Sequence, residues 1–107
     1  MSIPVEYSDL PGADLVHRGL EDLREGRTSA EALLVCIGAP RLRDLGLAVP
    51  DSPVENPEHA LWFLLAERQP DFHSAFNALR RRLVSFQRAL EHRRRRAERP
   101  AVASLDS

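Results

Sequence analysis

The sequence has no lysine, one cysteine and few aromatic residues. Because Cys36 is the only cysteine, an intramolecular disulfide framework is excluded. Aromatic residues make up 6% and charged residues 29% of the 107 residues, which favours a helical globular protein over a β-sandwich or barrel. The length suits one small domain. We therefore expect an all-α fold.

The sequence also lacks a long apolar run. Its longest strongly apolar stretch, Ala60 to Ala66, is far shorter than the roughly 20 residues that span a bilayer. The start, Met1 to Glu6, has neither the basic nor the apolar region of a signal peptide. These absences predict a cytoplasmic protein that does not enter a membrane.

Charge is unevenly distributed along the chain. Residues 1–70 carry six arginines and twelve acidic residues, a balance of −6, whereas residues 71–107 carry nine arginines and four acidic residues, a balance of +5. All 15 basic residues are arginine, which a GC-rich coding bias explains without any function. The opposite charges of the two parts predict pairing within the fold, between protomers or with a partner.

Apolar periodicity and breaker residues predict a small bundle of four main helices. The expected ranges are about 11–25, 29–38, 57–69 and 71–98, with a long amphipathic helix at the C-terminal end. Residues 1–99 would form the single domain, opened by an extended arm over 1–9. Pro100 would stop the last helix and leave 100–107 as a disordered tail.

Capping residues mark the predicted helix ends. Ser8 or Asp9 is expected to cap the first helix, and Gly26 to end it in a left-handed conformation. The segment 28–31 has the form of a capping box in which the Thr28 oxygen caps the second helix, and 38–40, Gly-Ala-Pro, is expected to end that helix. The segment 41–45 would add a short turn closed by a glycine.

The third helix is expected to start at Asn56, which is followed by a proline suited to the first helical position. Its apolar residues cover nearly its whole circumference, which predicts that it is the central helix of the bundle.

The last helix carries a heptad seam. Its apolar residues follow at spacings of 4, 3, 4, 3 and 4, and they are Phe72, Phe76, Leu79, Leu83, Phe86 and Leu90. A helix over 71–98 would be roughly 42 Å long at 1.5 Å per residue, which exceeds what a small bundle covers. The seam is then both core and, toward its C-terminal end, a projecting surface.

Arginines flank this seam. With Phe76 at heptad position a, Arg80 and Arg94 fall at e, and Arg82 and Arg96 at g, so an acidic neighbour is preferred to in-register self-pairing. Candidates are the acidic end of the first helix, a homo-oligomer or a separate acidic helical protein; the first of these contributes Glu21, Asp22 and Glu25. The predicted partner-binding residues are Arg80, Arg82, Leu83, Phe86, Leu90, Arg93, Arg94, Arg95 and Arg96.

The run from Arg93 to Arg96 forms a basic collar around the helix. Such a collar is suited to phosphates, so a nucleic-acid-binding module is an alternative. A solvated basic helix end that complements the helix dipole explains the run without any ligand and is the preferred interpretation. No aromatic residue is interleaved with these arginines, which disfavours base stacking.

No pattern in the sequence identifies a catalytic or metal site. The histidines, at 17, 59, 73 and 92, form no i, i+4 pair, and Cys36 has no ligand nearby in sequence. We predict no cofactor. Arg68 and His73 resemble the Arg-x4-6-His motif of the HEPN ribonucleases, in which case His73 would be the acid/base and Arg68 the phosphate anchor. Pro70 lies between them and interrupts the helix that carries the motif in that family, so a coincidental spacing is the preferred interpretation.

The sequence thus favours a non-enzymatic helical interaction protein. It would act as an oligomeric adaptor or as the small subunit of a two-component, antitoxin-like system, through its arginine-rich last helix.

Overall fold

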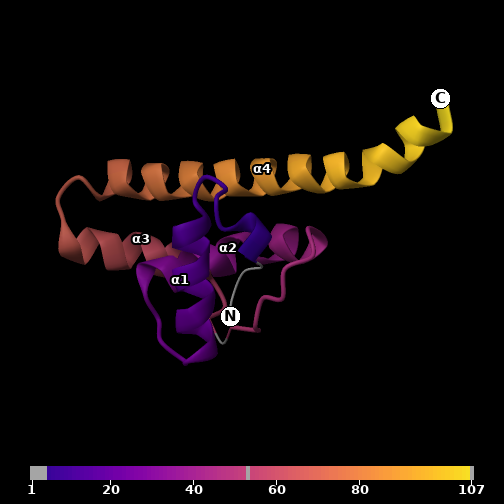
Figure 1. The fold of residues 1–107 in the computed structure, drawn as a ribbon. Coiled ribbons are helices and arrows are strands. Elements are labelled where there is room, and N and C mark those ends of the chain that lie inside the picture. Colours follow the sequence, from indigo (N-terminus) through magenta and orange to yellow (C-terminus); the bar gives the residue numbers. More distant parts are fainter. Residues whose placement is uncertain (1–4, 53, 107) are drawn as a thin grey trace.

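The computed structural model describes the backbone of residues 5–52 and 54–106, and the side chains of residues 6–52 and 54–96. A 3-10 turn, η1 (Val5–Tyr7), precedes four α-helices (Figure 1). These are α1 (Ala13–Arg24), α2 (Ala30–Asp44), α3 (Pro57–Arg68) and α4 (Phe72–Asp106). The predicted all-α bundle is confirmed. None of the described helices combines the length and apolar character needed to cross a membrane.

Side-chain caps begin two of the helices. Ser29 Oγ accepts a hydrogen bond from the Ala32 amide at 3.1 Å, and Asn56 Oδ1 accepts one from the His59 amide at 3.2 Å. The prediction for Asn56 is confirmed. The cap of α2 is Ser29 and not Thr28, because the helix begins at Ala30 and the capping position is the residue directly before it.

The start of α1 differs from the prediction. Its N-cap is Gly12, at φ 80°, which offers no side-chain oxygen, whereas Asp9, an expected cap, instead bonds to Arg93 on α4. The chain before it forms the η1 turn where an extended arm was expected. The other end matches the sequence: Gly26, at φ 76°, follows the last turn and donates its amide to the carbonyl of Leu23.

Helix α2 does not end at Pro40, as predicted, but continues to Asp44. Pro40 has no amide to donate, and an interior proline normally disfavours a helix. Here the flanking residues Ala39 and Leu42 are 7% and 0% exposed, so packing outweighs the lost hydrogen bond. Gly46, at φ 96°, then ends the segment.

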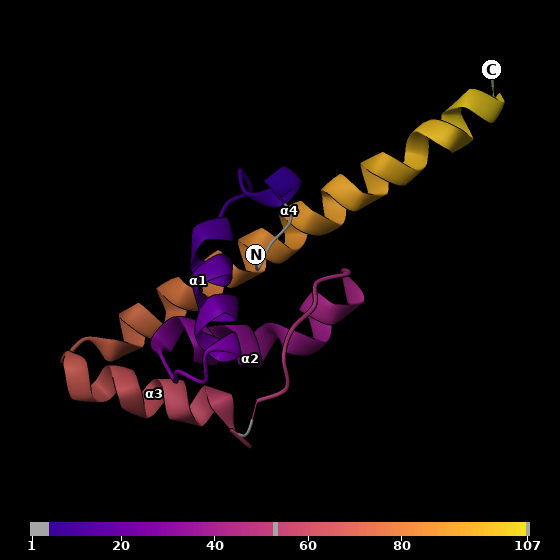
Figure 2. The ribbon, with the colours of Figure 1, turned by 60° about the horizontal axis from the view of Figure 1, so that its bottom comes forward.

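The central helix is α2, which contacts α1, α3 and α4. Its buried side chains include Leu33, Leu34, Val35 and Leu42. The prediction that the third helix is central is wrong, because only Leu61 and Leu65 of α3 are buried. Apolar residues all around α3 therefore did not place it at the centre of the bundle, since α3 lies at one side of α2 (Figure 2).

Helix α4 is a rod that runs along the other three helices and beyond them (Figures 1 and 2). It has 35 residues and gives the molecule its longest extent, 58 Å against 27 and 22 Å. It continues through Pro100 to Asp106, beyond the predicted end at 98.

Candidate interaction face of α4

The inner face of α4 is packed against its own chain. Leu83, Phe86 and Leu90 are 4%, 0% and 0% exposed. The segments around Gly12 and Gly38 lie very close to α4. A Cβ atom on Gly12 would come within 2.6 Å of the Arg82 carbonyl oxygen, and one on Gly38 would come within 2.9 Å of the Leu83 side chain.

This packing corrects the site predicted from the sequence. Leu83, Phe86 and Leu90 form core and are not accessible to a partner. The projecting part of α4 therefore begins beyond Leu90.

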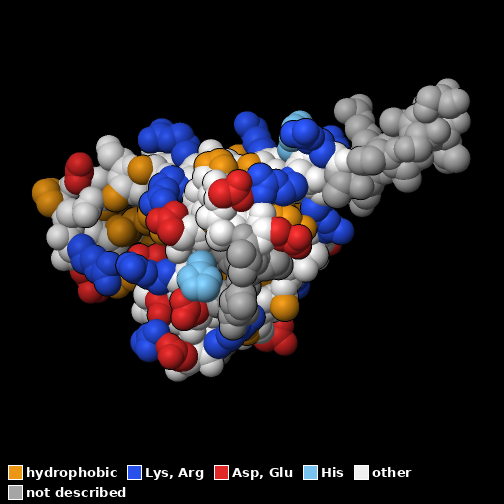
Figure 3. All heavy atoms as spheres, in the orientation of Figure 1, with side chains coloured by type: hydrophobic (Ala, Val, Ile, Leu, Met, Phe, Trp, Pro, Cys, Tyr) orange, Lys and Arg blue, Asp and Glu red, His pale blue; other side chains and the backbone are white. Residues whose placement is uncertain are grey.

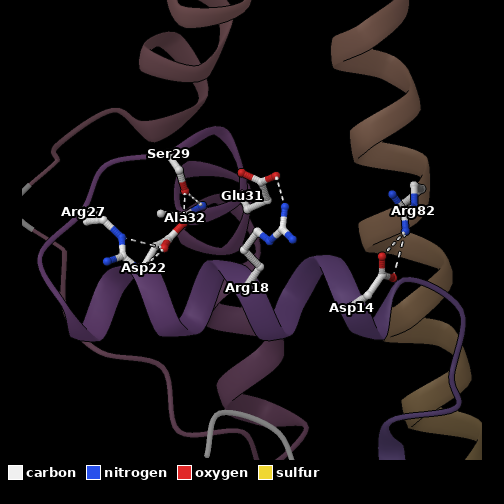
Figure 4. Close-up of polar contacts among 8 residues, drawn as sticks. All are labelled: Asp14, Arg18, Asp22, Arg27, Ser29, Glu31, Ala32 and Arg82. Atoms are coloured by element: carbon white, nitrogen blue, oxygen red, sulfur yellow. Dashed lines mark hydrogen bonds and ion pairs between the residues drawn. The ribbon is translucent and has the colours of Figure 1, made fainter.

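Several α4 arginines bind carboxylates of the same chain. Arg82 Nη2 donates to both oxygens of Asp14, at 2.9 and 3.2 Å (Figure 4). Arg93 makes a two-pronged contact with Asp9, at 2.8 and 3.1 Å, and also donates to the Glu6 carbonyl at 2.6 Å. These contacts connect α4 with α1 and with the segment that precedes α1.

The remaining predicted arginines have weaker intramolecular contacts. Arg80 pairs with Glu58 of α3 at 3.3 Å and lies over the Phe76 ring. Arg94 donates to the Asp44 carbonyl at 3.4 Å, and Arg95 contacts Glu91 at 3.4 Å. The collar of arginines is thus partly used by the fold itself.

The acidic neighbours of α4 are not those that the sequence suggested. Glu21 pairs with His17, and Asp22 and Glu25 pair with Arg27. Figure 4 shows the Asp22 network at the opposite end of α1 from the contact between Asp14 and Arg82. Because α1 meets α4 through its N-terminal end, its acidic last turn cannot reach the arginines.

The pairs with Arg82 and Arg93 shift the ionisation of their acids. The hydrogen bond from Arg93 lowers the pKa of Asp9, and the same bond raises the pKa of Arg93. For Asp14, burial alone would raise the pKa, but the hydrogen bond and charge of Arg82 outweigh it and leave the pKa lowered. Asp9, Asp14 and Arg93 are therefore charged at neutral pH.

The outer face of α4 carries the arginines that the fold does not use. Arg81, Arg88 and Arg96 are exposed, and their guanidinium groups make no hydrogen bond or ion pair within the described part of the chain. Basic side chains follow α4 along the top of the molecule in Figure 3. Arg81 and Arg88 were missed by sequence reasoning, although both occupy heptad position f, opposite the seam, as Arg95 does.

Two shallow hollows lie along these arginines. One, of about 520 Å³, is lined by Asn77, Arg80, Arg81, Val84, Ser85 and Arg88. The other, of about 730 Å³, is lined by Leu10, Arg88, Ala89, His92, Arg93 and Arg96. Arg88 borders both, and among the residues whose side chains the structure describes neither lining includes an acidic residue. We call Arg81, Val84, Arg88, His92 and Arg96 the outer face.

Arg68 and His73 are placed on different helices. Arg68 is the last residue of α3, and His73 lies in the first turn of α4. The His73 ring stacks on Phe72 at 4.5 Å and meets the Trp62 ring edge-on at 4.4 Å. Among the described residues, no group of three histidines, cysteines or acids is arranged to hold a metal ion.

Comparison with known proteins finds no matching family model, no matching curated protein and no matching solved structure.

Proposed function

We propose that this chain is a non-enzymatic interaction protein, an adaptor or small subunit, that binds an acidic helical segment of another protein along the outer face of α4. The observation that carries the proposal is the set of guanidinium groups at 81, 88 and 96, which are exposed and unpaired within the described residues while neighbouring arginines are bound to the fold.

The spacing of these arginines suits a helical partner. Arg81 and Arg88 are one heptad apart, which places them about 10.5 Å apart along the axis. A partner helix with acidic residues at heptad spacing presents carboxylates at the same interval. Val84, which is 38% exposed, lies between the two arginines and supplies an apolar contact. Charge pairing by the arginines around this apolar contact would determine which partner binds and how fast it associates.

A nucleic acid is the second candidate, because hollows with arginines and no acids also suit phosphates. The outer face has no phenylalanine, tyrosine or tryptophan for stacking on bases. Binding of this kind would therefore be insensitive to sequence and strongly weakened by salt.

The test compares two labelled probes by fluorescence anisotropy. One is a helical peptide with glutamate at heptad spacing, and the other is a mixed-sequence duplex DNA of similar length. We expect the peptide to bind, and the triple variant R81A/R88A/R96A to weaken this binding by about tenfold or more.

The matched control removes three arginines from other faces, as R18A/R24A/R68A, and is expected to change binding by less than about threefold. If the control weakens the peptide as much as the outer-face variant does, only net charge matters and the proposed face is wrong. Tighter, salt-sensitive binding of the DNA would favour the second candidate instead.

A further inference from the structure

Helix α3 presents an exposed ridge that the fold leaves uncovered. Phe63 is 59% exposed, the most exposed large hydrophobic residue in the described part of the chain. It lies on the side of α3 away from the buried Leu61 and Leu65. His59, Ala66 and Glu67 share this side and are also exposed.

The centre of the ridge is held in a fixed arrangement. The rings of His59 and Phe63 are stacked, with centroids 4.6 Å apart and planes inclined by 12°. An aromatic side chain already ordered at the surface loses little conformational entropy on binding. Exposed aromatic residues of this kind are typical centres of protein interfaces.

The residues around Phe63 are arranged symmetrically along the helix. Ala60 and Ala66 lie three residues to either side, and His59 and Glu67 lie four residues to either side. Positions three and four residues away share one helix face. The ridge therefore has one large residue at its centre, small residues beside it and groups able to carry opposite charges at its two ends.

This order makes the ridge complementary to itself in an antiparallel orientation. About a two-fold axis at Phe63, the two phenylalanines meet, and each has the small side chains of Ala60 and Ala66 beside it. His59 of one copy then lies opposite Glu67 of the other at both ends, about 6 Å along the axis from the centre. A parallel orientation would instead place like residues together.

The charged groups of the ridge are available for such a contact. Within the described residues, the Glu67 side chain makes no hydrogen bond or ion pair, and the only contact of this kind made by the His59 imidazole is its ring stack on Phe63. Glu58 is already paired with Arg80. A two-fold contact needs one surface that fits itself, which this ridge provides and the arginine-rich outer face of α4 does not.

We propose that a second copy of this chain docks on the α3 ridge, in an antiparallel pair with Phe63 at the two-fold axis and His59 opposite Glu67. This interface lies on α3, so it is independent of the binding proposed for α4. The failure of either proposal leaves the other standing.

The first test is the solution mass over a concentration series reaching about 1 mM, by sedimentation equilibrium. We expect the wild-type mass to rise toward twice the chain mass of 12.0 kDa. F63E should remain monomeric with an unchanged helical circular-dichroism spectrum. The matched control is V84E, which places the same charge at the other exposed hydrophobic residue and should dimerise like the wild type.

A charge exchange tests the antiparallel register. H59E places a second carboxylate opposite Glu67 and should weaken the dimer by about tenfold. H59E/E67R restores opposite charges and should recover dimerisation. A wild-type chain that stays monomeric throughout, an F63E variant that still dimerises, or a double variant no better than H59E would overturn the proposal.

Discussion

Asp22 links the end of α1 to the start of α2. The residue is 8% exposed, and its carboxylate accepts hydrogen bonds from Ser29 Oγ at 2.5 Å and from Arg27 Nε at 3.0 Å (Figure 4). The same Ser29 oxygen accepts the bond from Ala32 that caps α2. One hydroxyl thus serves both the helix cap and the buried acid.

Replacement of Asp22 by asparagine should destabilise the fold in a pH-dependent way. The hydrogen bond from Ser29, and then the contacts with Arg27, lower the pKa of Asp22. A lowered folded-state pKa contributes stability above the unfolded value, and this contribution is lost as the pH falls through the folded value. We expect D22N to lose about 1–2 kcal/mol of unfolding free energy near neutral pH.

Urea unfolding followed by circular dichroism measures this difference. The gap between wild type and D22N should narrow below about pH 4, where the unfolded-state carboxyl is protonated. E21Q, an exposed neighbour, serves as the control. A gap of constant size down to strongly acidic pH would show that the Asp22 charge is not what stabilises the link.

At the scale of helices, α1 and α2 approach each other closely at Gly19. A Cβ on Gly19 would lie 2.5 Å from Val35 Cγ2 and would also clash with the carbonyl oxygen of Glu31. Because backbone atoms cannot move aside, the two helices would have to separate. Glycine is required here for space and not for its backbone angles.

Gly19→Ala should therefore lower the unfolding free energy by about 2–3 kcal/mol, although alanine is the better helix former. The exposed neighbouring variant R18A is the control and should change it by less than about 1 kcal/mol. Thermal and urea unfolding would measure both. A G19A variant as stable as the wild type would contradict the close approach of α1 and α2.

The sequence predicted those helix features that depend on neighbouring residues. The cap at Asn56 and the stop at Gly26 follow from local hydrogen bonds and backbone angles, and both are confirmed. The passage of α2 through Pro40 and the central position of α2 depend on packing between helices. Periodicity identifies an apolar face but does not say which helix covers it.

The candidate site was predicted less completely, because it too depends on contacts between segments that are far apart in the sequence. The heptad seam identified the inner face of α4, but the sequence assigned its C-terminal part to a partner, whereas Leu90 is 0% exposed within the chain. The pairing of Arg93 with Asp9 joins residues 84 positions apart and has no local signal. Which arginines are free follows only once such pairs are known.

For the whole molecule, acidic residues of the N-terminal part reduce the basic charge that α4 presents. Asp9 and Asp14 bind Arg93 and Arg82, and their side chains are 68% and 80% exposed. Such exposed pairs contribute little to stability. Their larger effect is to leave a limited set of arginines for binding.

D9N/D14N should consequently strengthen binding to polyanions while the fold persists. The variant frees two guanidinium groups next to the outer face and removes two negative charges. We expect it to elute from heparin at higher salt than the wild type, with a nearly unchanged melting temperature. D51N/E55Q, which removes two acids from the 46–56 loop, is the matched control.

Equal shifts in the two variants would mean that heparin responds to net charge alone. Elution of D9N/D14N together with the wild type would mean that Arg82 and Arg93 contribute nothing when they are released.

The limited burial of α3 affects the order in which the helices open. Only Leu61 and Leu65 of α3 are fully buried, although Trp62 and Leu64 also pack partly against the core, whereas α2 is buried against three helices. We therefore expect amide hydrogens of α3 to exchange through local opening and those of α2 to require global unfolding. A second copy held on the α3 ridge binds only the closed form. Self-association would then appear as slowed deuterium uptake confined to α3, so that exchange rates would locate the interface without any measurement of mass.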